Sequence, residues 1–338
     1  MINLKSIASG ALLSLAMITT LGANDKFVPS DNKNLAVLYT FDKENDKAFD
    51  DFAKNDLKKI GYFINDPHHR VNDAYKEQFG STELDLISFS SILNEDVVRP
   101  LLNKDPRLGG FSPFNLLNFR KKSDMKTVVA HLTPEAILDI LGIDDKEIRK
   151  VYIESFKPLD SLIEKKLGGK KSYLPLAGRA DDTMMNFEIP FEEPEDIDDF
   201  LDEFQEKFES TFEIKGFVIA GFYNIKESFN NEEDVMPAFT SFWSYDLCHI
   251  PFSYEIFDGK KALPEAGIFA PCSMYIYLKE GENKLVIGMP TLSAWAGALG
   301  ITDVDKMRYI EQLDKSIPEI ILGLGGKAVA NGNPLLSK

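Results

Sequence analysis

The fold follows from a stretch of sequence that is present in two similar copies. The first copy is residues 104–150, KDPRLGGFSPFNLLNFRKKSDMKTVVAHLTPEAILDILGIDDKEIRK. It aligns without a gap with residues 262–308, ALPEAGIFAPCSMYIYLKEGENKLVIGMPTLSAWAGALGITDVDKMR. A shift of 158 positions gives 13 identities in these 47 positions. The identities are Pro106, Gly109, Phe111, Pro113, Lys121, Lys126, Val128, Thr133, Ala136, Leu141, Gly142, Ile143 and Asp145 with their counterparts. Self-similarity at a fixed offset indicates that the chain holds two copies of one unit.

Both copies predict the same order of elements. Each opens with an apolar-rich strand, at 35–41 and at 184–191, and continues into a helix with apolar residues at helical spacing. Four further strands are expected in each copy, the last two as a hairpin (113–120 with 126–132, and 271–278 with 284–289), before a closing helix. This order predicts an α+β fold, a tandem duplication of a strand-helix-four-strand-helix unit. In each two-layer unit, helices pack on an antiparallel sheet.

Composition sets the expected boundaries of the two units. The first α+β repeat is predicted over residues 24–167 and the second over 184–326. The polar, Gly-rich segment 168–183 is predicted to link them, and residues 327–338 to form a loosely held C-terminal tail.

Residues 1–23, MINLKSIASGALLSLAMITTLGA, have the layout of a Sec signal peptide. One charge, Lys5, precedes an apolar run of about 15 residues, which is shorter than the roughly 20 that cross a bilayer. We therefore expect cleavage after Ala23 and a periplasmic or secreted protein, the alternative being an uncleaved anchor. No later stretch predicts an integral membrane segment.

The net charge of the chain and the absence of known catalytic motifs exclude several classes of function. The chain of 338 residues has 54 acidic and 38 basic residues, a net charge of -16, so nucleic acid is not an expected partner. The nucleophile-elbow, zinc-protease, P-loop, dinucleotide and c-type haem motifs are all absent from the sequence. We therefore favour binding over catalysis and expect no cofactor, and whether a metal is bound stays open.

Two sets of side chains are candidates for a site. Cys248, His249, Cys272 and Met274 lie near the ends of successive expected strands, and they suit either a disulfide or a soft metal such as Cu(I). Plain burial of the cysteines is the alternative. The aromatic residues of the second copy either pack in the core or line a pocket for a small apolar or aromatic ligand. Those residues are Trp243, Tyr245, Tyr275, Tyr277 and Trp295.

The remaining histidines have simpler interpretations. His68 and His69 are predicted to lie in an exposed polar loop. His131 matches Met289 of the other copy, which favours a packing position over a catalytic one.

The second copy resembles a known family. Cys248 after an apolar strand, Phe269-Ala270-Pro271-Cys272 opening a strand-turn-strand, and a Leu-Gly helix end are similar to the family of unknown function 302 (DUF302). The resemblance covers residues 184–325, and reaches 35–168 mainly through the internal repeat. It implies a small α+β domain and brings no established activity. Phe114 and Ser90 replace the two cysteines in the first copy, so a cysteine site is expected in the second copy alone.

Together these features predict an exported, soluble binding or accessory protein. Its expected partner is a small apolar or aromatic ligand, or a periplasmic protein. The alternative is a redox-linked or soft-metal accessory protein that uses Cys248 and Cys272.

Overall fold

The structure is a computed structural model that describes residues 31–42, 44–180, 182–227, 234–259, 261–332 and 335. The signal peptide predicted over residues 1–23 lies outside the described residues. Two six-stranded antiparallel sheets are present, one in each repeat, and this confirms the α+β duplication. None of the helices in the described ranges combines the length and apolar character needed to cross a membrane.

The first repeat has the sheet order β2-β3-β4-β5-β1-β6. Its strands are β1 (Asn34–Phe41), β2 (Tyr62–His68), β3 (Leu84–Asn94), β4 (Phe114–Lys121), β5 (Thr127–Leu132) and β6 (Lys170–Pro175). Its helices are α1 (Asp46–Asn55), η1 (Leu57–Ile60), α2 (Val71–Phe79), α3 (Glu95–Leu102), η2 (Pro106–Phe111), α4 (Pro134–Ile140) and α5 (Lys146–Lys166).

The second repeat follows the same plan, with the sheet order β8-β9-β10-β11-β7-β12. Its strands are β7 (Met184–Pro190), β8 (Val218–Asn224), β9 (Phe239–Cys248), β10 (Cys272–Lys279), β11 (Lys284–Pro290) and β12 (Lys327–Val329). Its helices are α6 (Ile197–Ile214), α7 (Ile250–Phe257), η3 (Pro264–Phe269), α8 (Leu292–Leu299) and α9 (Val304–Gly323).

Identical residues start matching helices in the two repeats. The Thr133 hydroxyl accepts the Ala136 N–H at 3.3 Å, and the Thr291 hydroxyl accepts the Ala294 N–H at 3.1 Å. Asp145 and Asp303 cap α5 and α9 in the same way. A side-chain oxygen that accepts an otherwise unpaired N–H contributes about 1 kcal/mol to helix stability. The repeated sequence therefore fixes the same helix starts twice.

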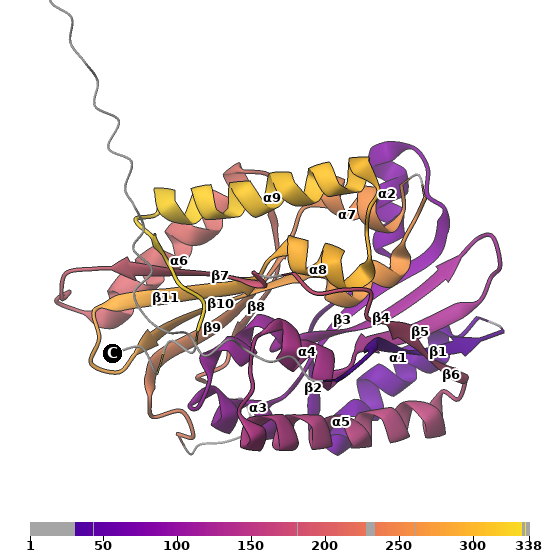
Figure 1. Ribbon diagram of the computed structural model, residues 1–338, viewed down its shortest axis with the longest axis horizontal. Helices are drawn as coiled ribbons and strands as arrows, with labels where there is room; N and C mark the ends of the chain where they lie inside the picture. Colours follow the sequence, from indigo (N-terminus) through magenta and orange to yellow (C-terminus); the bar gives the residue numbers. More distant parts are fainter. Residues whose placement is uncertain are drawn as a thin grey trace, which may run out of the picture.

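The two repeats pack against each other through the inner faces of their sheets. Figure 1 shows α5 and α9 on opposite outer sides, with the strands of both sheets between them. The η2 segment contacts β10 and β11 of the other repeat, and η3 contacts β4 and β5. Each repeat is a two-layer unit, and the pair forms a helix-sheet-sheet-helix arrangement.

The contacts between the repeats are reciprocal. Phe111 meets its own counterpart, Phe269, with ring centroids 6.3 Å apart. A Cβ on Gly109 would lie 2.7 Å from Cβ of Tyr275, and a Cβ on Gly267 would lie 2.9 Å from Cδ1 of Leu117, the residue that matches Tyr275. The two glycines therefore allow each repeat to approach the central strand of the other, with an approximate two-fold axis between Phe111 and Phe269.

Three segments differ from the sequence-based expectation. The linker predicted over 168–183 contains β6, which pairs with β1, and the tail predicted over 327–338 contains β12, which pairs with β7. The polar stretch after β2 forms α2. Both short strands satisfy edge N–H and C=O groups of a neighbouring strand, a requirement that local composition does not reveal.

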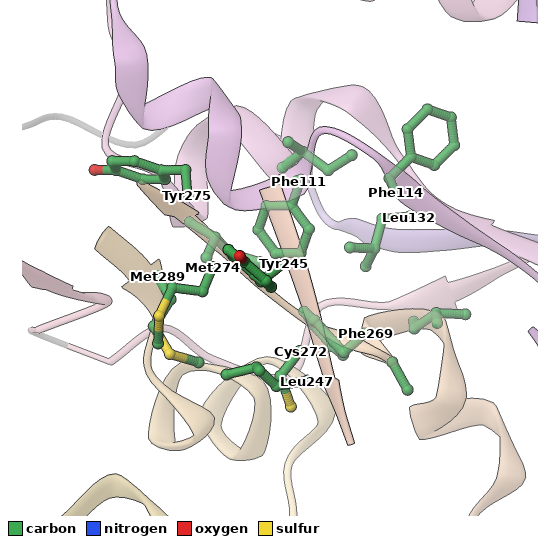
Figure 2. Packing of buried hydrophobic residues seen from close by; sticks show 14 of the residues in the cluster. Phe111, Phe114, Leu132, Tyr245, Leu247, Phe269, Cys272, Met274, Tyr275 and Met289 are labelled. Carbon is green, nitrogen blue, oxygen red and sulfur yellow. The ribbon is translucent and has the colours of Figure 1, made fainter. Parts of the chain in front are cut away.

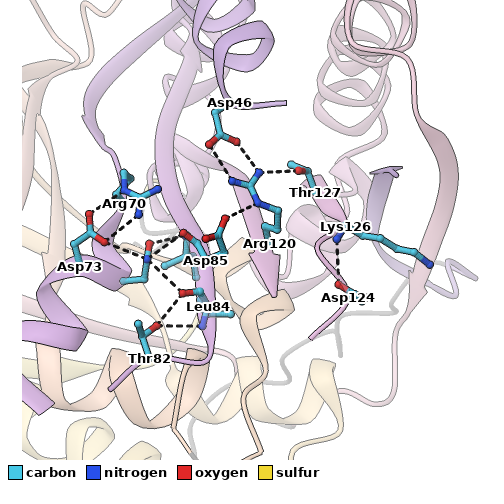
Figure 3. Close-up of polar contacts among 12 residues, drawn as sticks. Asp46, Arg70, Asp73, Thr82, Leu84, Asp85, Arg120, Asp124, Lys126 and Thr127 are labelled. Carbon is cyan, nitrogen blue, oxygen red and sulfur yellow. Dashed lines mark hydrogen bonds and ion pairs between the residues drawn. The ribbon is translucent and has the colours of Figure 1, made fainter. Parts of the chain in front are cut away.

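A buried arginine on β4 connects its strand to three other elements of the first repeat. The Arg120 guanidinium on β4 donates to Asp46 of α1 at 2.7 and 3.0 Å, to Asp85 of β3 at 2.7 Å and to Thr127 of β5 at 3.0 Å (Figure 3). These hydrogen bonds raise the pKa of Arg120 further above its usual value. Leu278 stands at the matching position of the second repeat, so this network belongs to the first repeat only.

Candidate functional site

A small apolar cavity of about 110 Å³ lies between the two repeats. The first repeat contributes His68, Val71 and Phe89 to its wall. The second repeat contributes the end of β9, the start of β10, part of α7 and Trp295 of α8. Among the described residues that line the cavity, none is Lys, Arg, Asp or Glu. The cavity therefore suits a neutral, mainly apolar molecule.

Strand register brings the two cysteines to this cavity. Cys272 begins β10 and lies opposite Leu247 of β9 (Figure 2). Cys248 is the next residue along β9. Both thiols line the cavity, together with His249 and Trp295. Four of the nine side chains singled out in the sequence therefore meet in one place. They come from both predicted sets, the cysteine set and the aromatic set.

The cavity opens to solvent on one side. Val218 at the start of β8 is 48% exposed, and Cys248 and His249 are half-buried. Cys272 and Phe252 are buried at the inner side.

Burial decides the protonation of the groups in the wall. It raises the pKa of the Cys248 thiol to about 11 and that of the Cys272 thiol well above its usual value. It also lowers the pKa of His249. At neutral pH the two thiols and the imidazole are therefore uncharged, and the thiols are weak nucleophiles and weak metal ligands.

The two histidines at the cavity are held by backbone groups. His68 Nε2 donates to the Ala220 carbonyl of β8 at 2.5 Å, so β2 and β8 are joined across the repeats. His249 Nδ1 accepts the Phe252 N–H at 3.3 Å and caps α7. The exposed polar loop predicted for His68 is wrong, because the other repeat covers this end of β2.

The same region of the first repeat is filled by aromatic rings. Phe114, at the position of Cys272, stacks on Phe156 of α5 at 4.7 Å and lies 6.1 Å from the Tyr62 ring. Counted from the matching caps Asp145 and Asp303, Asp314 stands at the position of Phe156. The second repeat thus has a thiol and a carboxylate where the first has two stacked rings. The Asp314 carboxylate accepts from the Leu292 and Ser293 N–H groups at 2.7 and 2.8 Å, so it turns toward the start of α8.

Comparison with solved structures finds chains similar to this one. One of them is the crystal structure of an uncharacterized conserved protein DUF302 from Bacillus stearothermophilus, which matches 42% of this chain and 95% of its own, at 14% identity and a TM-score of 0.29. No family model and no curated protein matches the chain. A likeness at this TM-score supports no conclusion about function. Membership of the DUF302 family stays a prediction.

The other five predicted side chains lie away from the cavity wall. Met274 is fully buried on β10, and Trp243 packs near Phe222 at 6.3 Å. Tyr245 donates its hydroxyl to Glu209 of α6 at 2.9 Å. Tyr275 and Tyr277 face the other way, into the contact between the repeats, where Tyr275 donates to Asn186 at 3.1 Å.

The disulfide and metal hypotheses for the cysteines stay predictions. Both cysteines are free thiols in the structure. Within the part of the chain that the structure describes, His, Cys, Asp and Glu side chains form no group of three or more that is placed to hold a metal ion.

A wider hollow of about 680 Å³ lies at the turn between α8 and α9, lined by residues that include Lys261, Asp303 and Lys306. Its charged groups already have partners: Lys261 pairs with Asp303 at 2.6 Å, and Lys306 donates to the Glu255 and Ile256 carbonyls at the end of α7. The smaller cavity is therefore the better candidate for a site, although it encloses less space.

A buried carboxyl near the cavity escaped the sequence analysis. Asp246 on β9 is 2% exposed and accepts hydrogen bonds from Ser91 of the first repeat at 2.6 Å and from Ser273 at 2.9 Å. Burial raises its pKa to about 6, while the two hydroxyls and His68 oppose that rise and Asp66 adds to it. The only sequence signal was an acidic residue inside an apolar strand, where strand register gives the first repeat Ser91.

Proposed function

We propose that this is an exported binding protein that holds a small, neutral, apolar molecule in the cavity between its repeats. The observation that supports the proposal most directly is the replacement of the stacked pair Phe114 and Phe156 by Cys272 and Asp314. Phe114 and Phe156 pack together in the first repeat, whereas Cys272, at the position of Phe114, lines the cavity.

The size of the cavity limits the ligand. An apolar cavity of roughly 150 Å³ accepts benzene in other proteins, so about 110 Å³ suits a molecule of roughly five to seven non-hydrogen atoms. Burial of five methylene groups at about 0.8 kcal/mol each gives about 4 kcal/mol, which corresponds to a Kd of about 1 mM. Cyclopentane is a probe of this size.

Filling the cavity tests the proposal. Cys272→Phe places in the second repeat the ring that Phe114 supplies in the first, and we expect it to abolish cyclopentane binding measured by ligand-observed NMR. Cys272→Ala is the matched control, because it removes the same thiol but leaves the cavity open. Unchanged cyclopentane binding by Cys272→Phe would contradict the proposal. Equal loss in both variants would show that the thiol, rather than the volume, matters.

Export is tested separately. If residues 1–23 are a signal peptide, protein purified from the extracytoplasmic fraction should begin at Asn24, as read by mass spectrometry of the intact chain. Native mass spectrometry of the same material would show whether a small molecule, metal or protein stays bound. A full-length chain retained in the cytoplasm would contradict export and leave the cavity proposal standing.

A second candidate is a redox or soft-metal role for Cys248 and Cys272. It is favoured by the position of both thiols at one cavity next to His249. Titration with Cu(I) under reducing conditions tests it. A soft-metal site predicts one copper per chain, lost in both Cys248→Ser and Cys272→Ser. A count of free thiols in denatured, unreduced protein distinguishes a disulfide (none) from free cysteines (two).

A further inference from the structure

We infer that the molecule held in the cavity carries one hydrogen-bond acceptor, such as a carbonyl oxygen, that receives the indole N–H of Trp295. This inference rests on the proposed function and names the chemistry of its ligand. The class it assigns is a compact neutral carbonyl compound, a ketone or an ester.

The indole of Trp295 is the starting point. Its ring is 4% exposed, stacks on Phe269 with centroids 5.1 Å apart and lines the cavity. Its Nε1–H is buried and finds no hydrogen-bond partner among the described residues. A buried donor left unpaired costs about 1–3 kcal/mol, so an acceptor brought in by a ligand would be stabilised there.

Most of the other polar groups of the wall already have hydrogen-bond partners. His68 donates to the Ala220 carbonyl, the Ser253 hydroxyl donates to the Ile250 carbonyl at 3.0 Å, and His249 accepts from the Phe252 N–H. The two thiols are weak hydrogen-bonding groups. With Nδ1 as an acceptor, His249 carries its proton on Nε2, and this imidazole is only half-buried. Among the buried groups of the wall, the indole N–H is therefore the strong donor that is left for a ligand.

Comparison with the first repeat supports a role beyond packing. Ile137 stands at the position of Trp295, is fully buried and carries no polar atom in its side chain. The second repeat thus has an indole N–H donor beside its cavity, and the first repeat has no donor at the matching position.

The neutrality of the ligand follows from the wall. A carboxylate or an ammonium ion would lose its water without gaining a counter-charge, since the described lining residues include no acidic or basic side chain apart from the two histidines that are held by backbone groups. A ketone or ester oxygen needs only the one donor.

Two probes of nearly equal shape test the inference. Cyclopentane and cyclopentanone are titrated into the mature chain, into Trp295→Phe and into Trp243→Phe, with Kd measured by ligand-observed NMR. Trp295→Phe keeps an aromatic ring and removes the N–H. We expect it to weaken cyclopentanone binding about fivefold and cyclopentane binding less than twofold, as for the loss of one hydrogen bond. Trp243 lies outside the cavity wall, so Trp243→Phe should change the Kd of neither probe.

A second readout covers the case in which Trp295→Phe does not fold. In ¹⁵N-labelled Trp243→Phe, the single indole N–H resonance belongs to Trp295. Cyclopentanone should shift its proton downfield, and cyclopentane should not. Equal effects of both probes, or an unmoved resonance with cyclopentanone bound, would overturn the inference and leave the proposed function intact. If neither probe binds the wild-type chain, both fail together.

Discussion

The two repeats share a fold and differ in how they fill it. At the start of the first hairpin strand, the first repeat stacks Phe114 on Phe156, with Tyr62 and His131 close by. The second repeat has Cys272 at this point and a cavity beside it. The helix caps and the glycines of the repeat contact are the same in both. Although most aligned positions differ between the copies, this difference in packing depends on a few core positions, which can be exchanged one at a time.

The largest loss of stability is expected when the stacked ring of Phe114 is removed from the first repeat. Phe114→Cys gives the first repeat the residue of the second, removing a ring that contacts Phe156, Tyr62 and His131. We expect a loss of about 3–4 kcal/mol in the free energy of unfolding, measured by urea denaturation. The reverse exchange, Cys272→Phe, should change stability by less than about 1 kcal/mol, because the ring enters existing space. Similar losses in both variants would mean that the repeats are equally packed.

The next effect concerns the pH dependence of the free energy of unfolding. A buried aspartate in each repeat contributes to it, and the two contributions have opposite signs. The pKa of Asp246 is raised to about 6 in the folded state, from an ordinary value of 3.8. Between these values the folded chain keeps a proton that the unfolded chain has lost, so stability falls as pH rises from about 4 to 6. A shift of this size corresponds to about 3 kcal/mol. Asp246→Asn should remove the fall.

Asp160 of the first repeat is the control for that experiment. Burial opposes its ionisation, but a hydrogen bond from His131 at 3.0 Å and another from Tyr39 at 2.9 Å leave its pKa lowered. Its contribution is present above the ordinary pKa and lost as pH falls. Asp160→Asn should therefore lower stability at pH 7, whereas Asp246→Asn should raise it. Equal signs in urea denaturation at pH 4, 5, 6 and 7 would contradict the assignment.

A smaller effect tests the reciprocal contact between the repeats. Gly109→Ala would place a Cβ against the Cβ and Cγ of Tyr275, which the strand holds in place, and we expect a loss of about 2 kcal/mol. Gly267→Ala meets the Cδ1 end of Leu117, which rotates more easily, and should cost about half as much. Gly323→Ala has nothing within 4 Å and serves as the neutral control. A larger loss for Gly267→Ala than for Gly109→Ala would contradict this geometry.

The smallest effect concerns a single hydrogen bond across the repeats. Ser91→Ala removes the 2.6 Å donor to Asp246 and should cost about 1 kcal/mol at pH 7. Ser244→Ala is matched in type and burial, and the Ser244 hydroxyl has no partner among the described residues. It should therefore leave the midpoint of urea denaturation unchanged or raise it. If both variants lose the same stability, the Ser91 bond contributes nothing of its own.

Much of the fold could be predicted because the sequence contains two copies of the same unit, and each copy supports the assignment of elements in the other. The 158-residue offset matched Gly109 with Gly267 and Thr133 with Thr291, and the structure gives each pair the same role. The edge strands β6 and β12 were missed, since their residues carry no alternating pattern and are held by the neighbouring strand.

The candidate site was only half predictable, for a physical reason. Alternation along a strand separates two faces but does not say what covers each one. For Tyr275 and Tyr277 the sequence left open whether they pack in the core or line a pocket, and the other repeat packs against their face. His68 and Phe89 reach the cavity from the first repeat, and nothing local in their sequence signals a partner about 150 residues away.

The meeting of Phe111 with Phe269 has a further consequence. A residue that touches its own equivalent is the hallmark of an isologous interface, the kind that joins two identical subunits. In a homodimer every substitution appears on both sides of the axis at once, so a cavity opened in one subunit opens in the other. Covalent linkage removes that constraint. One half of this chain is therefore free to keep its core packed while the other half loses packing and leaves a cavity.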